Sequence, residues 1–151
     1  MRVSAARVSL AIRSPVSRRE RAKITTTVYI LDDDASVRTA LARLLKAAGM
    51  HAELFATLHD LISHEAPVPH ACIVADAGSI GGNAPGFMAG LQEREWKTPV
   101  ILLSAVDAAL DRLAAKEAGA AAFFRKPVDG QALIDTIEFI VNSNHSVSTN
   151  T

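Results

Sequence analysis

The chain has 151 residues and equal numbers of acidic and basic side chains, so its formal net charge is zero. Hydrophobic residues make up 49% of it and aromatic residues 5%, which predicts one domain with a largely aliphatic core. Residues 1–23 hold seven Arg or Lys and one Glu, so the rest of the chain is acidic. An acidic domain argues against direct nucleic-acid binding, and no apolar stretch is long enough to insert into a membrane.

The basic segment 1–23 resembles a targeting peptide in its Arg, Ser and Ala content. Arg7 and Arg13 interrupt its apolar run, which argues against a secretory signal. We interpret the segment as a disordered basic extension or as residues translated from an upstream start site, and composition does not separate the two. In either case we expect it to be dispensable for folding.

From residue 24 onward, short apolar runs alternate with helical patterns. In chain order we predict a strand at 27–31, a helix at 37–48, an alternating strand at 51–55, a short helix at 58–64, a strand at 71–75, a glycine-rich loop at 77–86, a helix at 87–95, a strand at 100–104, a helix capped by Asp107 and closed by Gly119, a strand at 121–124 and a last helix through Leu133 to Val141. The residues 143–151 form a polar tail that we expect to be frayed.

This alternation predicts an α/β fold with a flavodoxin-like, doubly wound, five-stranded parallel sheet of order 2-1-3-4-5 and helices on both faces. The continuously apolar runs ACIVA and VILLS suit strands buried on both faces, whereas HAELF alternates as an edge strand should. The single cysteine, Cys72, lies in ACIVA, excludes an internal disulfide and fits a reducing compartment. We expect it to be a buried small hydrophobe.

Polar residues stand where the predicted strands end, and open α/β sheets bind their ligands outside the carboxyl ends of the strands. These residues are Asp32, Asp33, Asp76, Ser104 and Lys126. Each alone is typical of a turn, a cap or a solvated surface, but five of them at four strand ends indicate a site. Clustered carboxylates repel by roughly 4 kcal/mol for a pair at about 4 Å with an effective dielectric near 20, a cost that a simple turn would avoid with Asn, Ser or Gly.

The segments YILDDDASVR, CIVAD, VILLSA and FFRKP, in this order, resemble a response-regulator receiver domain of two-component signalling. The spacing between Asp32, Asp76, Ser104 and Lys126 is similar to that of the family. No single segment is specific, but the ordered set is. The resemblance implies a receiver domain over residues 24–142, between the basic extension and the polar tail.

By this resemblance, Asp32 and Asp33 are the acidic pair that holds Mg²⁺, and Asp76 is the phosphoacceptor that also binds the metal. The backbone carbonyl of Gly78 is the next expected protein ligand. Lys126 supplies a second positive charge beside the phosphoryl group. The expected donor is a histidine kinase or a histidine phosphotransfer protein.

The resemblance also implies how the phosphorylated state is recognised. Ser104 joins Asp76 and Lys126 in the reactive set, because the family's hydroxyl at this position moves to the phosphoryl oxygen. Phe123 has the position of the aromatic switch residue, which rotates into the vacated space. Pro127 resembles the family's cis proline.

The loop after Asp76 departs from the family pattern. Ser79 and Ile80 stand where the family commonly has Met-Pro, which leaves open whether docking and phosphoryl lifetime are altered, although no metal ligand is lost. Asp34 lies outside the expected metal site, and we interpret it as a solvated residue or a helix cap near Ser36.

Two alternatives are open. The pair Asp32 and Asp34 resembles the nucleophile motif of haloacid-dehalogenase-type phosphatases, but the further acidic pair of that family is lacking after Lys126, and Asp76 would have no role. The altered loop also allows a receiver-fold binding module that does not signal through phosphate.

The preferred interpretation is a signalling protein that catalyses only its own phosphorylation and dephosphorylation, rather than an enzyme with a separate substrate. No output domain fits after Val141, so we expect a stand-alone cytoplasmic receiver that docks to another protein. Its pathway and downstream target stay unknown, and the sequence does not show whether phosphorylation produces a dimer.

Overall fold

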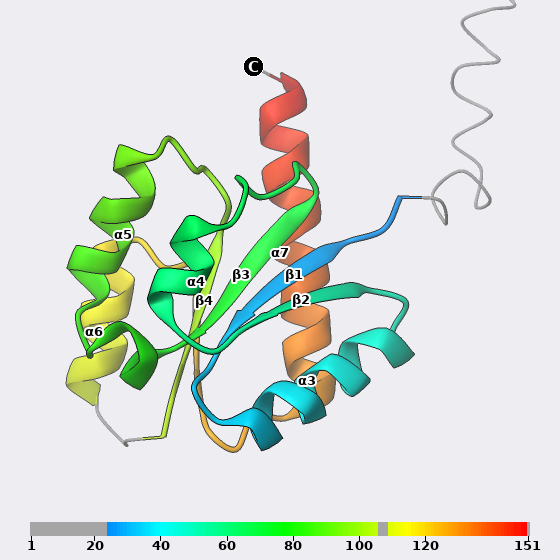
Figure 1. Ribbon diagram of the computed structural model, residues 1–151. Helices are drawn as coiled ribbons and strands as arrows, with labels where there is room; N and C mark the ends of the chain where they lie inside the picture. Colours follow the sequence, from blue (N-terminus) through cyan, green and yellow to red (C-terminus); the bar gives the residue numbers. More distant parts are fainter. Residues whose placement is uncertain (1–23, 106–108, 151) are drawn as a thin grey trace, which may run out of the picture.

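The computed structural model describes residues 24–105 and 109–150, in which strands and helices alternate along the chain (Figure 1). The elements are β1 Thr27–Leu31, α3 Ala35–Ala47, β2 His51–Phe55, α4 Leu58–Ser63, β3 Ala71–Asp76, the 3₁₀ helix η1 Ala77–Ile80, α5 Ala84–Glu93, β4 Val100–Ser104, α6 Ala109–Ala118, β5 Ala122–Arg125 and α7 Gly130–Asn150. The predictions for residues 1–23 and for Asp107 concern parts of the chain outside the described residues.

The five strands form one parallel sheet in the order β2-β1-β3-β4-β5, as the sequence predicts. β1 lies between β2 and β3, with Thr27 opposite His51 on one side and Ala71 on the other. β3 and β4, which are buried along their whole length, are the continuously apolar runs, and the alternating β2 lies at an edge. Strand order reverses between β1 and β3, so a crevice is expected at their carboxyl ends.

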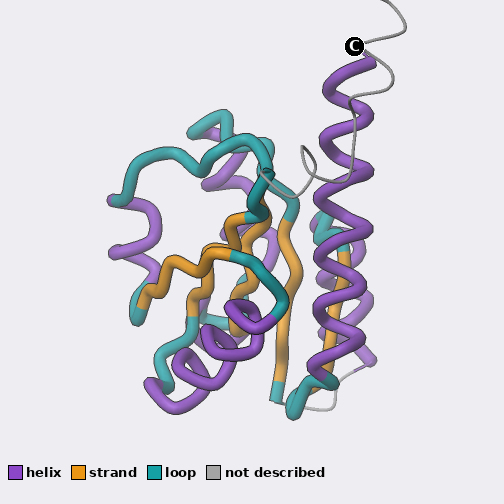
Figure 2. The backbone as a smooth tube through the Cα atoms, turned by 90° about the vertical axis from the view of Figure 1, so that its right-hand side faces the viewer, coloured by secondary structure: helices purple, strands orange, loops and turns teal. Residues whose placement is uncertain are grey.

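Helices cover both faces of the sheet (Figure 2). α4, α5 and α6 pack on one face, where Leu61, Leu91 and Ala115 join the core cluster beneath the strands. α3 and α7 pack on the other face, where Leu45 and Ile137 are fully buried. Alternate residues of each strand enter these two clusters, because successive side chains of a strand point to opposite faces.

Local capping sets the start of α3 beside the crevice. Asp34 is the N-cap residue, and its carboxylate accepts hydrogen bonds from the backbone N–H groups of Ser36 at 2.8 Å and Val37 at 3.3 Å. This confirms the interpretation of Asp34 as a helix cap. Gly49, which follows the helix, has a φ of 81°, a left-handed conformation that glycine adopts without strain.

The segment predicted as a loop at 77–86 is more regular than expected. Its first residues form η1, and α5 begins at Ala84 instead of near 87. Asn83 caps α5 by accepting a hydrogen bond from Gly86 N–H at 3.0 Å. Pro85 is tolerated in the first helical turn because its missing N–H has no partner to lose there.

The last helix is longer than the predicted pattern through Leu133 to Val141, because α7 continues to Asn150. No glycine or proline follows Val141, and the Asn and Ser residues there cost only a fraction of a kcal/mol each in a helix. The helical hydrogen-bond pattern therefore has no strong interruption before Asn150, the last residue that the structure describes.

Candidate functional site

Three strands deliver polar side chains to one edge of the sheet. Asp32 directly follows β1, Asp76 is the last residue of β3 and Ser104 is the last residue of β4. All three are buried, with 1%, 9% and 3% of their surfaces exposed. Since carboxyl ends of neighbouring parallel strands lie at the same edge, residues from distant parts of the sequence meet here.

Lys126 lies just beyond β5 and reaches across this edge. Its Nζ lies 2.7 Å from Asp32 Oδ2 and 2.9 Å from Asp76 Oδ1, so one ammonium contacts two carboxylates. Its backbone N–H donates to Ser104 O at 2.8 Å, which ties the ends of β4 and β5 together. The bond between Lys126 and Pro127 is cis, which confirms that prediction.

The charge of this lysine is set by opposing effects. Partial burial lowers the pKa of Lys126, but its hydrogen bonds and attraction to Asp32 and Asp76 outweigh burial and hold that pKa above the ordinary lysine value. Lys126 is therefore a fixed positive charge at neutral pH.

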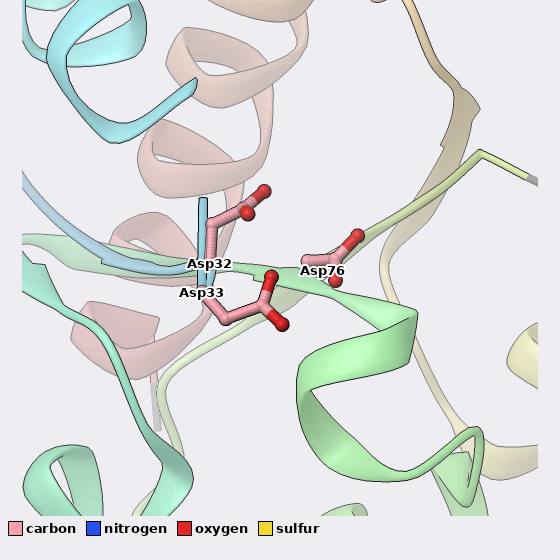
Figure 3. Close-up of side chains that lie close together, drawn as sticks. All are labelled: Asp32, Asp33 and Asp76. Atoms are coloured by element: carbon pink, nitrogen blue, oxygen red, sulfur yellow. The ribbon is translucent and has the colours of Figure 1, made fainter. Parts of the chain in front are cut away.

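The carboxylates of Asp32, Asp33 and Asp76 converge, and one oxygen of each lies within 4.8 Å of the others (Figure 3). Asp33 is exposed, whereas the other two are buried, so the cluster opens toward solvent on the side of Asp33. Lys126 pairs with two of these three carboxylates, Asp32 and Asp76. Three converging carboxylates are an all-oxygen donor set of the kind that Mg²⁺ prefers, so these residues fit the metal that the sequence predicts.

Gly78 stays a prediction as the fourth protein ligand. Its carbonyl oxygen accepts a hydrogen bond from Gly81 N–H at 3.1 Å, which uses one of its two lone pairs. A side chain at this position would crowd the phosphoacceptor candidate, because a Cβ on Gly78 would lie 3.2 Å from Asp76 Oδ2.

Ser79 joins the cluster in a way that the sequence analysis missed. Its hydroxyl donates to Asp76 Oδ2 at 3.1 Å and accepts from the backbone N–H of Asp33, also at 3.1 Å. Its own N–H donates to Asp76 Oδ2 as well. Asp at an N-cap three residues before this serine was a sequence signal for the backbone contact, but nothing local indicated the contact to Asp33.

Asp34 and Arg38 lie beside the cluster and outside it. The backbone N–H of Asp34 donates to Asp32 Oδ1 at 2.9 Å, which helps to orient that carboxylate. Arg38 donates to the backbone carbonyl of Asp32 at 2.7 Å and holds the loop after β1. Because the Asp34 side chain caps α3, the geometry does not support its role in a phosphatase motif.

Ser104 and Phe123 lie on neighbouring strands. Ser104 is opposite Arg125, and Leu102 is opposite Phe123, so the serine and the aromatic residue are diagonal neighbours on one face of the sheet. Phe123 is partly buried against the cluster beneath α4, α5 and α6. The guanidinium carbon of Arg112 lies over the Phe123 ring, 5.1 Å from its centre, which is within cation–π distance.

Sequence comparison decides the family of the chain, because residues 28–138 match the response regulator receiver domain. The chain belongs to this family. Its members act in two-component signal transduction, generally as signalling proteins rather than metabolic enzymes. The receiver shows 32% identity over 124 residues to the transcriptional regulatory protein TdiR of Thauera aromatica, covering 82% of this chain and 54% of TdiR. It shows 33% identity over 103 residues to the KDP operon regulator KdpE of Escherichia coli, covering 68% and 45% of the two chains.

Solved structures agree with this assignment. The receiver matches the response regulator StyR with a TM-score of 0.74 and 31% identity, covering 84% of this chain and 64% of StyR. It also matches a receiver protein from Burkholderia phymatum with a TM-score of 0.64 and 31% identity, covering 78% and 96% of the two chains. The receiver spans about half the length of TdiR and less of KdpE. Among its described residues, no helix has the length and apolar character needed to cross a bilayer.

Proposed function

We propose that this receiver accepts a phosphoryl group on Asp76 from a phosphohistidine donor, with Mg²⁺ bound by Asp32, Asp33 and Asp76. The observation that carries the proposal is the position of the Lys126 ammonium, within hydrogen-bond distance of both Asp32 and Asp76. The Asp76 carboxylate lies beside the positive charge of Lys126 and beside the residues proposed to bind a metal ion. This position suits a nucleophile that attacks a negatively charged phosphoryl group.

The reaction forms one bond and breaks one. An oxygen of the Asp76 carboxylate attacks phosphorus, the bond between phosphorus and the donor imidazole nitrogen breaks, and the electron pair leaves with the imidazole. Asp76 then carries an acyl phosphate, which water can hydrolyse to restore the carboxylate. Lys126 stabilises the charge on the phosphoryl oxygens and keeps the Asp76 side chain turned toward the incoming group.

Bound Mg²⁺ would neutralise the repulsion between the three carboxylates and the phosphoryl oxygens. The residues that would hold it are Asp32, Asp33 and Asp76, together with the carbonyl of Gly78. Asp32 is held in place by Lys126 and by the N–H of Asp34, so it contributes a fixed ligand. Asp33 is exposed and provides the ligand at the solvent side.

An apolar groove beside the site supports a protein as the phosphoryl donor. The groove has a volume of about 630 Å³ and includes Leu41 and Leu44 of α3 together with Val128 after β5. Its wall also includes Lys126, so it is continuous with the site. A histidine kinase or phosphotransfer protein could bury apolar side chains here while its phosphohistidine reaches Asp76. A cytoplasmic location and a downstream protein target belong to the same proposal.

The readout part of the proposal concerns Ser104 and Phe123. The Ser104 hydroxyl would move to a phosphoryl oxygen on Asp76, and Phe123 would then turn inward and change the surface formed by α6, β5 and α7. The short path from the end of β4 to the neighbouring strand β5 supports this coupling.

The decisive experiment incubates the full chain with acetyl phosphate and Mg²⁺ and measures its intact mass. Wild type should gain one phosphoryl group, which hydroxylamine should remove because the product is an acyl phosphate. Asp76→Asn keeps nearly the same volume without the nucleophilic carboxylate, and it should gain none while remaining folded. Adding a chelator before the donor should also prevent the gain in mass.

If wild type gains no phosphoryl group from acetyl phosphate, and a phosphorylated histidine phosphotransfer protein gives none either, phosphoryl transfer is lost as the function. The binding-module alternative would then take its place. Steady release of inorganic phosphate that persists in Asp76→Asn would favour the phosphatase alternative, because the nucleophile of that motif is Asp32.

A further inference from the structure

The contacts of Asp76 distinguish its two carboxylate oxygens. Oδ1 receives the Lys126 ammonium at 2.9 Å. Oδ2 receives two donors from Ser79, the backbone N–H and the hydroxyl, both at 3.1 Å. The carboxylate is therefore held from both sides, and its rotation about the Cβ–Cγ bond is restricted.

The two contacts from Ser79 have different origins. The backbone N–H contact caps η1, and any residue other than proline at position 79 would supply it. The hydroxyl contact needs serine or threonine. The capping of η1 therefore does not account for the hydrogen bond from the Ser79 hydroxyl to Asp76.

The same hydroxyl also reaches the loop after β1. The Ser79 hydroxyl accepts a hydrogen bond from the N–H of Asp33, which is 46 positions away in the sequence, and donates a hydrogen bond to Asp76 Oδ2. These two hydrogen bonds link the backbone N–H of Asp33 to the carboxylate of Asp76. Ser79 is only partly buried, so threonine, which keeps the hydroxyl, is the conservative replacement at this position.

Transfer to a carboxylate depends on orientation, because the attacking oxygen must lie in line with the bond that breaks. Without the Ser79 hydroxyl, Asp76 Oδ2 would keep only the backbone N–H of residue 79, and the carboxylate would lose its link to the loop of Asp33. Gly78 has no side chain that could limit the movement of the Asp76 carboxylate. A Cβ at position 78 would lie close to Asp76 Oδ2. Ser79 is the side chain that holds Oδ2.

We propose that Ser79 is a positioning residue for phosphoryl transfer, whose hydroxyl fixes the plane of the Asp76 carboxylate and ties it to the loop of Asp33. This inference rests on the proposed function of Asp76. It assigns a role to the position where this chain departs from the usual Met-Pro loop.

The test compares the phosphorylation kinetics of Ser79→Ala and Ser79→Thr with wild type, using the full chain, acetyl phosphate and Mg²⁺. Ser79→Ala should lower the rate at saturating donor about tenfold, which corresponds to about 1.4 kcal/mol. The half-saturating concentrations of donor and Mg²⁺ should change less than about twofold, because neither metal ligands nor donor contacts are removed. Ser79→Thr keeps the hydroxyl and should stay within about twofold of the wild-type rate.

A second readout does not depend on phosphorylation. The Asp33 amide should exchange its hydrogen faster in Ser79→Ala than in wild type and Ser79→Thr, because its acceptor is lost. Ser63→Ala removes an exposed serine at the end of α4 and serves as the matched control, with wild-type rate and exchange.

A wild-type rate in Ser79→Ala would overturn the inference while leaving Asp76 as the acceptor. So would an equal loss in Ser79→Thr, or a loss in Ser79→Ala that saturating Mg²⁺ restores, since the serine would then act on metal binding. An unchanged Asp33 amide in Ser79→Ala would show that the hydrogen-bonded link is absent. If wild type gains no phosphoryl group from acetyl phosphate or from a phosphorylated histidine phosphotransfer protein, the proposed function fails, and the positioning role fails with it.

Discussion

Lys126 and Asp32 are 94 positions apart in the sequence, yet the Lys126 Nζ donates a hydrogen bond to Asp32 Oδ2 at 2.7 Å. The Asp32 side chain is almost completely buried, whereas the lysine side chain keeps 19% of its surface exposed. The same ammonium contacts Asp76. The resting site is thus held together by one cation that two buried carboxylates share.

Replacing Lys126 by methionine should destabilise the protein at neutral pH by about 1–3 kcal/mol, because buried carboxylates lose their donor. The folded-state pKa of Lys126 is raised, so the folded protein holds the proton more tightly than the unfolded chain. The stabilisation by Lys126 is therefore fully present below the unfolded-state pKa of about 10.4, and it is lost as pH rises through the higher folded-state pKa. Urea unfolding of wild type and Lys126→Met from pH 8 to strongly alkaline pH measures this difference. If the stability difference between wild type and Lys126→Met grows as pH rises, Lys126 is not the stabilising cation of the site.

Asp33 and Asp34 are neighbours with separate roles, and alanine variants should separate them. Asp33→Ala should relieve repulsion and raise the stability of the metal-free protein by a few tenths of a kcal/mol, and weaken Mg²⁺ binding about tenfold or more. Asp34→Ala should cost about 1 kcal/mol by removing the cap of α3, and leave Mg²⁺ binding nearly unchanged. Thermal unfolding across a Mg²⁺ titration reports both quantities. Equal effects on Mg²⁺ binding would place Asp34 in the metal site and reopen the phosphatase motif.

Ser104→Ala should still accept a phosphoryl group but lose most of the response at Phe123, because the hydroxyl is the proposed link between the two. The measurement is the change in backbone amide signals around Phe123 when beryllofluoride and Mg²⁺ are added. Ser63→Ala, distant from the site, should respond as wild type does. An unchanged response in Ser104→Ala would remove Ser104 from the switch and leave Asp76 as the acceptor.

Cys72 should be inert in the folded protein. Its side chain is fully buried in β3, and burial raises the pKa of the thiol to about 12, so almost no thiolate is present near neutral pH. Labelling by a thiol reagent at pH 8 should be at least about a thousandfold slower than in urea, because the thiol reacts only after unfolding. Complete labelling of the native protein within minutes would show that β3 opens locally.

Much of the architecture could be predicted from local pattern. The apolar runs of β3 and β4 and the alternation of β2 indicated which strands lie inside the sheet, and right-handed crossovers left few strand orders. The residues at the strand ends followed from that order, because the carboxyl ends of parallel strands meet at one edge. The sequence alone therefore predicts that Asp32, Asp76 and Lys126 lie together.

Other features needed the tertiary structure. The start of α5 at Ala84 depends on the Asn83 cap, and the Ser79 hydroxyl contacts Asp33 only because η1 turns back toward the loop after β1. The position of Arg112 over Phe123 likewise joins a helix to a strand. Periodicity records which face of an element is buried, since that is a local property of the chain. Hydrogen bonds between loops depend on rotamers and loop paths that only the packed protein selects. The strand-end residues Asp32, Asp76 and Lys126 could therefore be predicted from the sequence, whereas the contacts of Ser79 that link Asp76 to the loop of Asp33 were decided by the tertiary structure.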